Sequence, residues 1–338
     1  MKIIKSSAEL IIENDPFKKI ELAGRTCYKS EEKITDGSAK KFTAAMIKSK
    51  HLAMVEHAVF VFDITDILMY DDFYEKLMNL RCCPHVQITQ TDILTKETII
   101  SDFHTQKRDD LISFKLENNK NRYRFLLSAN VRAINEWVCL KPILNSLTCY
   151  YPELAYNAEI IYDYSDAIRL VNLDDYDDIT EGEKDAHLYI TTRFITDRGV
   201  THEIVRHRPP SYAQESTRYV NYTKEKFRSK DGILFIEPAD FENWSRAGRR
   251  WLKRGIRFAE WAYNAMIKLK FAPQQARAVL PNALKTEIVM TANRAEWKHF
   301  FNLRFYGTTG APHPDMKLVA GKALGKFVEC GFIASISE

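Results

Sequence analysis

Residues 206–219 read Arg-His-Arg-Pro-Pro-Ser-Tyr-Ala-Gln-Glu-Ser-Thr-Arg-Tyr, and they decide how the rest of the chain is interpreted. The segment holds three arginines, one histidine and two serines in fourteen residues. Pro209 and Pro210 exclude a regular helix, because proline lacks a backbone N–H donor and disfavours helical geometry in the residue before it. The backbone is therefore expected to be extended or turning.

A non-helical segment with arginines at both ends is typical of an anion site. Guanidinium groups match phosphate oxygens and stay charged at any working pH. The serine hydroxyl and backbone N–H groups of Glu215–Thr217 can add neutral donors to the same phosphate. The residues alone leave three interpretations: a site for an anion or nucleotide, a solvated basic loop, and a nucleic-acid-binding loop. A net charge of +4 over 338 residues gives the last little support.

The spacing of this segment resembles the signature of the flavin-dependent thymidylate synthases. Arg-His-Arg is followed after seven residues by Ser216, and then by Arg218. The other segments that resemble the family are Arg25-Thr-Cys-Tyr28, His51-Leu-Ala-Met-Val-Glu-His57, and Ala276-Arg-Ala-Val-Leu-Pro281 with Asn293, His299 and Asn302-Leu-Arg304. The resemblance covers roughly residues 1–63 and 188–338.

This resemblance implies an α+β fold, with a mainly antiparallel sheet flanked by helices and long helices forming a subunit core. It also implies the reductive methylation of dUMP to dTMP. In that reaction NADPH reduces FAD, methylene-tetrahydrofolate supplies the carbon, and the reduced flavin completes the methyl group. The family further implies a homotetramer whose FAD sites are built from several subunits. The expected partners are thus dUMP, the folate and further copies of the chain.

The resemblance assigns most site residues to the C-terminal half of the chain. The residues expected to bind FAD are Arg206, His207, Arg208, Gln214, Asn293, His299 and His51. The residues expected to bind dUMP are Glu203, Arg206, Gln214, Glu215, Ser216, Thr217, Arg218, Arg277 and Arg304.

Arg304 is the expected catalytic residue. Its permanent cation, placed at the N3–O4 side of the uracil, would favour an enolate-like form. Negative charge then accumulates at C5, which must attack the methylene carbon. The alternative is a surface arginine near the end of a helix.

Two residues allow a second interpretation. Ser216 is interpreted as a ligand of the dUMP phosphate or ribose; the alternative, a nucleophile, needs an adjacent base. His51 is expected near the flavin and substrate, or else as a core histidine. Ala53 stands where a hydroxyl residue is common after His51, and Ala213-Gln214 where compact members often carry Asn-Glu.

Residues 64–185 are predicted to be an insertion within a single catalytic domain that spans 1–338. A possible strand at His85–Thr89, a helix-like stretch at Tyr123–Val138 and an acidic, loop-like run from Asp174 to Glu183 fall inside it. The insertion is either an elaboration on the surface or a part that modifies folate access or contacts between subunits.

Periodicity and turn residues predict the remaining elements. Strands are expected at Ile3–Ile4, Ala58–Asp63, Ile190–Ile195 and Glu287–Ala292, with a turn at Asp197–Gly199. Helices are expected near Pro16–Gly24, Ala39–Lys50 and Trp251–Leu269, from Pro273 to Pro281, after Asn293 as the N-cap, and over Pro314–Phe327.

Composition bears on where the protein is located and on whether it binds a metal ion. No apolar stretch is long enough to cross a bilayer, and Glu9 and Glu13–Asp15 do not suit a secretory signal. The six cysteines are scattered without a Cys-x-x-Cys pair, which is typical of reduced thiols. No Cys/His cluster has zinc-ligand spacing. We therefore expect a cytoplasmic, metal-free protein that binds neither membrane nor nucleic acid. The competing functions are another flavin or nucleotide oxidoreductase and a non-enzymatic nucleic-acid binder.

Overall fold

Strand β11 (Lys285–Asn293) is buried along all nine of its residues and lies at the centre of one antiparallel sheet. The computed structural model describes residues 1–64, 85–92, 95–96, 98–101, 123–137, 140–158, 168–218, 220–224 and 232–334. The core sheet has the order β2 (Ser7–Ile11), β8 (Tyr189–Asp197), β11, β9 (Ser211–Gln214). Because β11 pairs on both edges and is covered on both faces, it carries the apolar run Ile288–Met290 at its middle.

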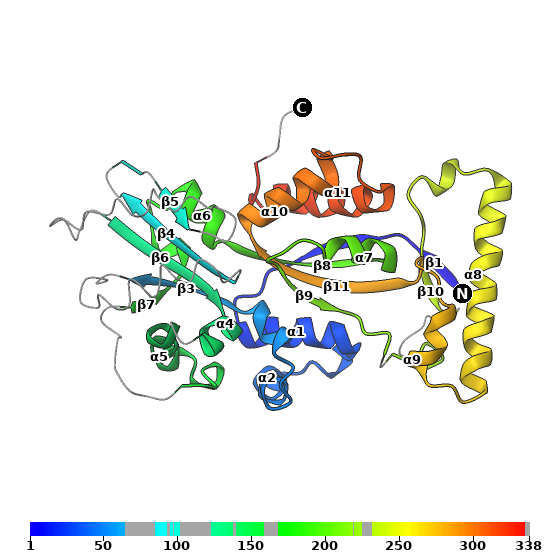
Figure 1. Cartoon of the computed structure of the whole chain (residues 1–338), viewed down its shortest axis with the longest axis horizontal. Helices are drawn as coiled ribbons and strands as arrows, with labels where there is room; N and C mark the ends of the chain where they lie inside the picture. Colours follow the sequence, from blue (N-terminus) through cyan, green and yellow to red (C-terminus); the bar gives the residue numbers. More distant parts are fainter. Residues whose placement is uncertain are drawn as a thin grey trace.

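Helices cover both faces of the core sheet (Figure 1). On one face lie α7 (Arg198–Ile204), α10 (Arg294–Phe301) and α11 (Pro314–Glu329). On the other lie α1 (Pro16–Tyr28) and α2 (Ser38–Lys48), with the 3-10 segments η1 (Glu31–Lys33) between them and η2 (Leu52–His57) after them. This arrangement places the core sheet in the middle of a three-layered body.

Aromatic packing fixes α10 against the core sheet. Trp297, Phe300 and Phe301 of α10 are fully buried, together with Phe194 of β8 and Phe327 of α11. Burial of each such side chain contributes roughly 1.5–3 kcal/mol relative to its exposure. The short helix is thus held by tertiary contacts rather than by its own propensity.

A second antiparallel sheet, the insertion sheet, lies beside the core sheet (Figure 1). Its order is β5 (Thr98–Ser101), β4 (Val86–Asp92), β6 (Tyr123–Asn130), β3 (Val59–Ile64), β7 (Ile168–Val171). The elements packed with it are α4 (Val131–Glu136), α5 (Lys141–Tyr150), η6 (Pro152–Leu154), η7 (Leu173–Asp175) and α6 (Glu181–His187). Strand β3 therefore joins the insertion sheet, whereas β8, where the chain returns from the insertion, joins the core sheet.

The far end of the molecule is formed by a parallel pair and a long helix (Figure 1). The pair is β1 (Lys2–Ile4) with β10 (Leu234–Ile236), and the helix is α8 (Arg246–Lys268). Around them lie η9 (Phe241–Asn243), α9 (Pro273–Ala276) and η10 (Arg277–Val279). Glu260 of α8 pairs with the amino group of Met1 at 2.9 Å, which ties the helix to β1.

The predicted α+β class with mainly antiparallel strands is confirmed. The strands expected at 3–4, 58–63, 190–195 and 287–292 and the helices expected at 16–24, 39–50, 251–269 and 314–327 are present, most of them longer than predicted. Asn293 is the N-cap of α10, since its side chain accepts a hydrogen bond from Glu296 N at 2.9 Å.

Four local predictions are wrong. The stretch 123–138 is not a helix: its first part forms β6, because alternate residues face the two sides of the insertion sheet, and only Val131–Glu136 is helical. The expected turn at 197–199 begins α7, because the Asp197 side chain accepts from Val200 N. The helix from Pro273 ends at Ala276 rather than Pro281. The acidic run is partly ordered, as η7 and α6.

Some predictions fall outside the described residues. These are Val138 and Tyr219, the cysteines Cys82, Cys83 and Cys139, and a large part of the insertion. The strand expected at 85–89 is described and corresponds to β4.

Candidate active site

Arg304 brings together two of the predicted residues. It lies in the π-helical segment η11 (Asn302–Tyr306), which continues α10. Its Nε donates to His207 Nε2 at 2.8 Å, and its Nη1 lies 3.2 Å from Glu203 Oε2 at the end of α7. The Arg304 side chain is 21% exposed and has partners on two elements, so it is not a freely solvated side chain. π-Helical turns are frequent at functional sites, because they re-aim one side chain out of the regular ladder.

His207 is a neutral imidazole in this group. Burial, together with the positive charges of Arg304 and His299, lowers its pKa to about 4. Since Nε2 accepts from Arg304, the proton of the neutral ring lies on Nδ1. Its ring packs edge-on against Phe300 at 5.0 Å and His299 at 5.9 Å between centroids. The imidazole therefore orients the guanidinium without competing with its charge.

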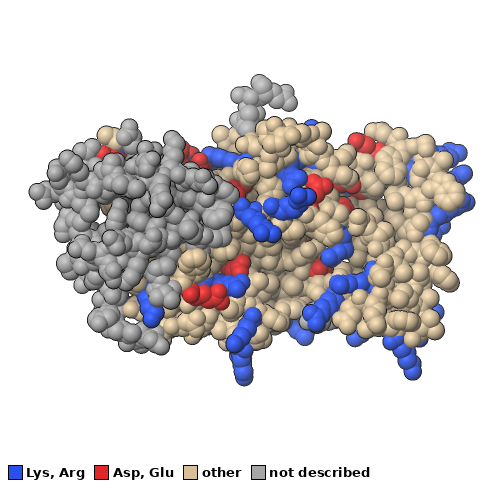
Figure 2. All heavy atoms as spheres, in the orientation of Figure 1, with Lys and Arg blue, Asp and Glu red and all other residues tan. Residues whose placement is uncertain are grey.

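The backbone around His207 is pinned by a neighbouring strand. Tyr212 of β9 places its hydroxyl 2.9 Å from the carbonyl oxygen of Ile204 and 2.8 Å from that of His207. Arg206 and Arg208 on either side are exposed. Figure 2 shows Lys and Arg side chains gathered on the face that carries α10 and α7, with acidic side chains beside them. This turn thus presents cations to solvent from a rigid base.

A second group of predicted residues lies after β9. Arg277 of η10 donates from Nη1 to Thr217 Oγ1 at 2.7 Å. Ser216 N donates to the Cys27 carbonyl at 2.9 Å, and Ser216 Oγ accepts from Arg218 N at 3.2 Å. No histidine among the described residues hydrogen-bonds to Ser216 Oγ.

Glu215 has a buried side chain that pairs inside the protein. Lys285 Nζ donates to it at 3.0 Å, and Tyr222 Oη lies at 3.4 Å. Burial raises the pKa of the Glu215 carboxyl, although Lys285 opposes this. Lys285 also pairs with Glu287, which accepts from Lys29 Nζ at 2.7 Å. Although burial alone would raise it, Lys285 and Lys29 lower the pKa of the Glu287 carboxyl.

Two of the family-like N-terminal segments meet each other. Tyr28, the last residue of α1, has its hydroxyl 2.6 Å from His51 Nδ1, and the two rings stack at 6.2 Å. His51 is exposed, so the core-histidine alternative is wrong. Its second ring nitrogen, Nε2, is therefore on a surface where it can meet a ligand.

The remaining predicted residues already make contacts within the fold. Asn293 caps α10 and donates from Nδ2 to Ala186 O at 3.1 Å, which leaves one N–H and one lone pair of its amide. Gln214 donates from Nε2 to Thr201 Oγ1 at 2.8 Å. His299 is exposed on α10 beside His207.

The predicted residues therefore form two groups within one chain. One comprises Glu203, His207, His299 and Arg304 on the α7–α10 face, and the other Ser216, Thr217, Arg218 and Arg277 around β9 and η10. Sequence reasoning missed the charges that support the second group: Lys29, Lys285 and Glu287. A signal was available, because Lys285 and Glu287 are alternate charged residues directly before the apolar run Ile288–Met290.

The described residues were also compared with the requirements of a metal site and of a membrane span. Among the residues described, no group of three or more His, Cys, Asp or Glu is arranged to hold a metal ion. No described helix combines the length and the apolar character that a bilayer span requires.

Comparison with known proteins assigns the chain to a family. It belongs to the Thy1 family of thymidylate synthase complementing proteins, whose model matches residues 9–73 and 185–329. The match is interrupted over 74–184, within the predicted insertion.

The similar curated proteins are flavin-dependent thymidylate synthases. One from Mycolicibacterium vanbaalenii is 37% identical over 131 residues, which covers 36% of this chain and 49% of the relative. One from Mycobacterium tuberculosis is 35% identical over 129 residues, with the same coverage of each chain. The chain thus spans about half the length of the curated relatives it matches.

A solved structure of a UMP/dUMP methylase, PolB from Streptomyces cacaoi bound with 5-Br dUMP, is also similar. It is 20% identical, with a TM-score of 0.35, and the match covers 42% of this chain and 66% of that one.

Proposed function

We propose that this chain is a flavin-dependent thymidylate synthase that methylates dUMP to dTMP. Methylene-tetrahydrofolate would be the carbon donor, and NADPH the reductant through FAD. The observation that carries the proposal is Arg304, held by His207 and Glu203 beside the exposed arginines of the segment 206–208. Family membership and the activity of the similar curated proteins point to the same reaction.

The donor set around His207 fits FAD. Arg206 and Arg208 are exposed cations on a pinned turn, which suits the two phosphates of a dinucleotide. The neutral His207 and the exposed His299 offer ring faces and N–H donors nearby. The other residues proposed to bind the flavin are Gln214, Asn293 and His51. Gln214 and Asn293 would use their side-chain amides, and His51 would use Nε2 of its imidazole. When bound and reduced, the flavin would supply the hydride that the methylene group requires.

The second group fits the phosphate and sugar of dUMP. Arg277 donates one N–H to Thr217, and its guanidinium carries four further N–H donors. Ser216 and Arg218 stand next to it on the same loop. The buried Glu215 would act by holding this loop rather than by direct contact, because its carboxylate is paired with Lys285. Glu203 would bind dUMP from the first group.

Arg304 would stabilise the charge that develops on the uracil. Its guanidinium has five N–H donors, of which Nε and two others contact His207 and Glu203. A cation held in place before the reaction stabilises an enolate without reorganising, which is the largest contribution that many active sites make.

We further propose that the site is completed by other copies in a homotetramer. The two groups lie on different parts of one chain, so a single dUMP would be bound by the groups of two copies. An apolar seam on α8 supplies a surface for association. Trp251, Phe258 and Ala265 repeat every seven residues, as do Gly255, Ala262 and Leu269. Trp251, Phe258 and Leu269 are between 67% and 72% exposed, and a seven-residue repeat is typical of a helix that packs along another helix.

The proposal is tested by a visible spectrum of the purified protein after incubation with FAD and desalting. Retained flavin bands that bleach with NADPH under anaerobic conditions are expected, followed by dTMP formation when dUMP and methylene-tetrahydrofolate are added. Flavin that bleaches without dTMP formation would indicate an oxidoreductase of another class. A folded protein that retains no flavin would contradict the proposal and favour a binding protein.

A further inference from the structure

Helix α6 is placed between the insertion sheet and α10 (Figure 1). It also stands at the border of the family match, which resumes at residue 185 within this helix. Its charged residues at 181 and 185 are four apart, as are Glu183 and His187. Residues four apart lie on one face of a helix, so these two pairs define two faces.

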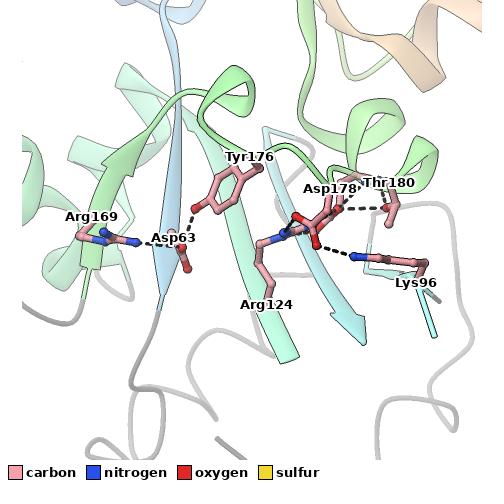
Figure 3. Close-up of polar contacts among 8 residues, drawn as sticks. Asp63, Lys96, Arg124, Arg169, Tyr176, Asp178 and Thr180 are labelled. Carbon is pink, nitrogen blue, oxygen red and sulfur yellow. Dashed lines mark hydrogen bonds and ion pairs between the residues drawn. The ribbon is translucent and has the colours of Figure 1, made fainter. Parts of the chain in front are cut away.

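One face of α6 is bonded to the insertion. Glu183 is fully buried, and its two oxygens accept from Arg124 Nε at 2.7 Å and Nη2 at 2.6 Å. Arg124 of β6 also donates to Asp178 at 2.7 Å and lies over the Tyr176 ring, 4.8 Å from its centroid (Figure 3). His187 contacts Thr89 Oγ1 and Ser128 Oγ, the side chains of β4 and β6, at 2.8 and 2.9 Å.

The other face is bonded to α10. The buried Arg294 donates from Nε to Asp185 Oδ1 at 2.5 Å and from Nη2 to Glu181 Oε2 at 2.6 Å. Lys298, one turn further along α10, donates to Asp185 Oδ2 at 2.8 Å. Asn293 donates to the Ala186 carbonyl at 3.1 Å. The first half of α10 is thus tied to α6 by charge-assisted bonds, which are stronger than neutral ones.

Residues of the insertion and of the core also surround one narrow hollow nearby. Asn130, at the end of β6, and Asn293, at the end of β11, line the same narrow hollow together with Ser211 of β9. Each asparagine caps the helix that follows it. The insertion therefore reaches α10 through α6, and its Asn130 lines a hollow shared with Asn293, the N-cap of α10.

We propose that the insertion positions the proposed flavin and dUMP site by acting through α6, with Glu183, Asp185 and Arg294 as positioning residues. The site-bearing residues His299 and Arg304 follow Arg294 on α10 and its π-helical continuation. Because α10 is short and rigidly packed, a shift at its start is carried to Arg304. The inference rests on the proposed function, because its effects on FAD binding and kcat can be measured only if the protein has that function. It gives the insertion a role other than a surface elaboration.

The first test compares Asp185→Asn with the matched control Glu153→Gln. Both variants replace a paired carboxylate by an amide, but Glu153 pairs with Lys40 at an exposed contact between η6 and α2. We expect Asp185→Asn to raise the FAD dissociation constant and to lower kcat for dTMP formation, each roughly 3- to 30-fold. The control is expected to change neither. Arg294→Lys, which can keep only one of the two ion pairs, should give an intermediate effect.

The second readout does not depend on activity. Hydrogen exchange of the amides of α10 should accelerate in Asp185→Asn and not in Glu153→Gln, because Asp185 no longer offers a charge to Arg294 and Lys298 of α10. Unchanged exchange in α10, or unchanged FAD affinity and kcat with only a lower melting temperature, would overturn the proposal. If the wild-type protein binds no FAD, the proposed function fails, and the exchange measurement alone decides whether α6 holds α10. Should Asp185→Asn not fold, Arg294→Lys takes its place in both measurements.

Discussion

The Arg304 guanidinium meets two unlike side-chain acceptors, a neutral imidazole nitrogen and a carboxylate, and also the backbone carbonyl of Glu203. The imidazole fixes its direction, and the carboxylate of Glu203 balances part of its charge. Because arginine has a planar fork of donors, it can satisfy both partners and still present N–H groups elsewhere. A lysine at the same position has the charge but not the fork.

Arg304→Lys should therefore lose catalysis while the protein stays folded. We expect kcat for dTMP formation to fall roughly 100-fold or more, the loss typical of removing one preorganised donor. The melting temperature should change little. Arg193→Lys is the control, since Arg193 pairs with the largely exposed Glu9 of β2. A wild-type kcat in Arg304→Lys would show that the charge alone, or another residue, activates the uracil.

The buried pair Lys285–Glu215 supports the loop that follows β9. In Lys285→Met, Glu215 loses its ion pair but keeps the Tyr222 hydroxyl as a hydrogen-bond partner, and breaking a buried ion pair costs about 3–5 kcal/mol. Glu287, which also pairs with Lys285, keeps Lys29 as its partner. The double variant Glu215→Leu/Lys285→Met removes both charges and should recover much of the free energy of unfolding. Urea unfolding of the wild type and the variants measures this. A double variant less stable than Lys285→Met would mean that the charges do not act as a pair.

At the scale of elements, helix α8 carries two sets of apolar residues, one buried and one exposed. Ile256, Ala259 and Tyr263 are buried against the parallel pair and its surroundings. The seam containing Trp251 and Phe258 lies on a neighbouring side of the helix and is exposed. A second, exposed apolar stripe beside the buried one predicts a second packing partner, because a lone amphipathic helix needs only one apolar face.

Phe258→Asp should weaken self-association. A buried, unpaired carboxylate at the centre of a helix–helix seam is costly, so smaller species should appear in size-exclusion chromatography with light scattering. Lys253→Ala is the control, because Lys253 lies off the seam. Loss of bound FAD together with the change in size would connect assembly to the site. An unchanged mass in Phe258→Asp would move the interface away from α8.

At the scale of the whole molecule, two sheets share buried histidines that hold them together. His57, the last residue of η2 before β3, bonds from Nδ1 to Thr291 Oγ1 of β11 at 2.8 Å. His187 bonds the end of α6 to β4 and β6. Burial lowers the pKa of each to about 3. Both rings are therefore neutral in the folded protein at any ordinary pH.

The stability of the protein should fall in mild acid. Above about pH 6.5 these histidines are neutral in both the folded and the unfolded chain, so they add no pH dependence. As the pH falls toward 3, the unfolded chain binds protons that the folded protein cannot bind. Each buried histidine then lowers the free energy of unfolding by about 1.4 kcal/mol per pH unit.

His187→Gln isolates one of these contributions. The variant loses hydrogen bonds and should be less stable at pH 7, but its stability should fall less steeply between pH 6 and pH 4. Urea unfolding at several pH values gives the slope, with the exposed His202→Gln as the control. Parallel slopes for the wild type and His187→Gln would contradict the role of His187.

Local sequence determined most of the elements and pointed to the site. The proline pair excluded a helix at 209–210, and this segment leads into β9. Asn293 caps its helix as expected, and the helical spacing of apolar residues between 251 and 269 correctly predicted α8. The stretch 123–138 was mistaken for one helix, because a short apolar run has no decisive period and its pairing with β3 and β4 comes from residues far away.

By itself, the sequence determined the family, the α+β class and the types of residue available to the site, because a spaced motif and local periodicity are written in consecutive residues. Only the tertiary structure decided that Arg304 meets His207 and Glu203, that Glu215 is paired with Lys285, and that α6 joins the insertion to α10. Those contacts link residues 59 to 113 positions apart. Such pairings depend on how whole elements pack, and no local pattern encodes them.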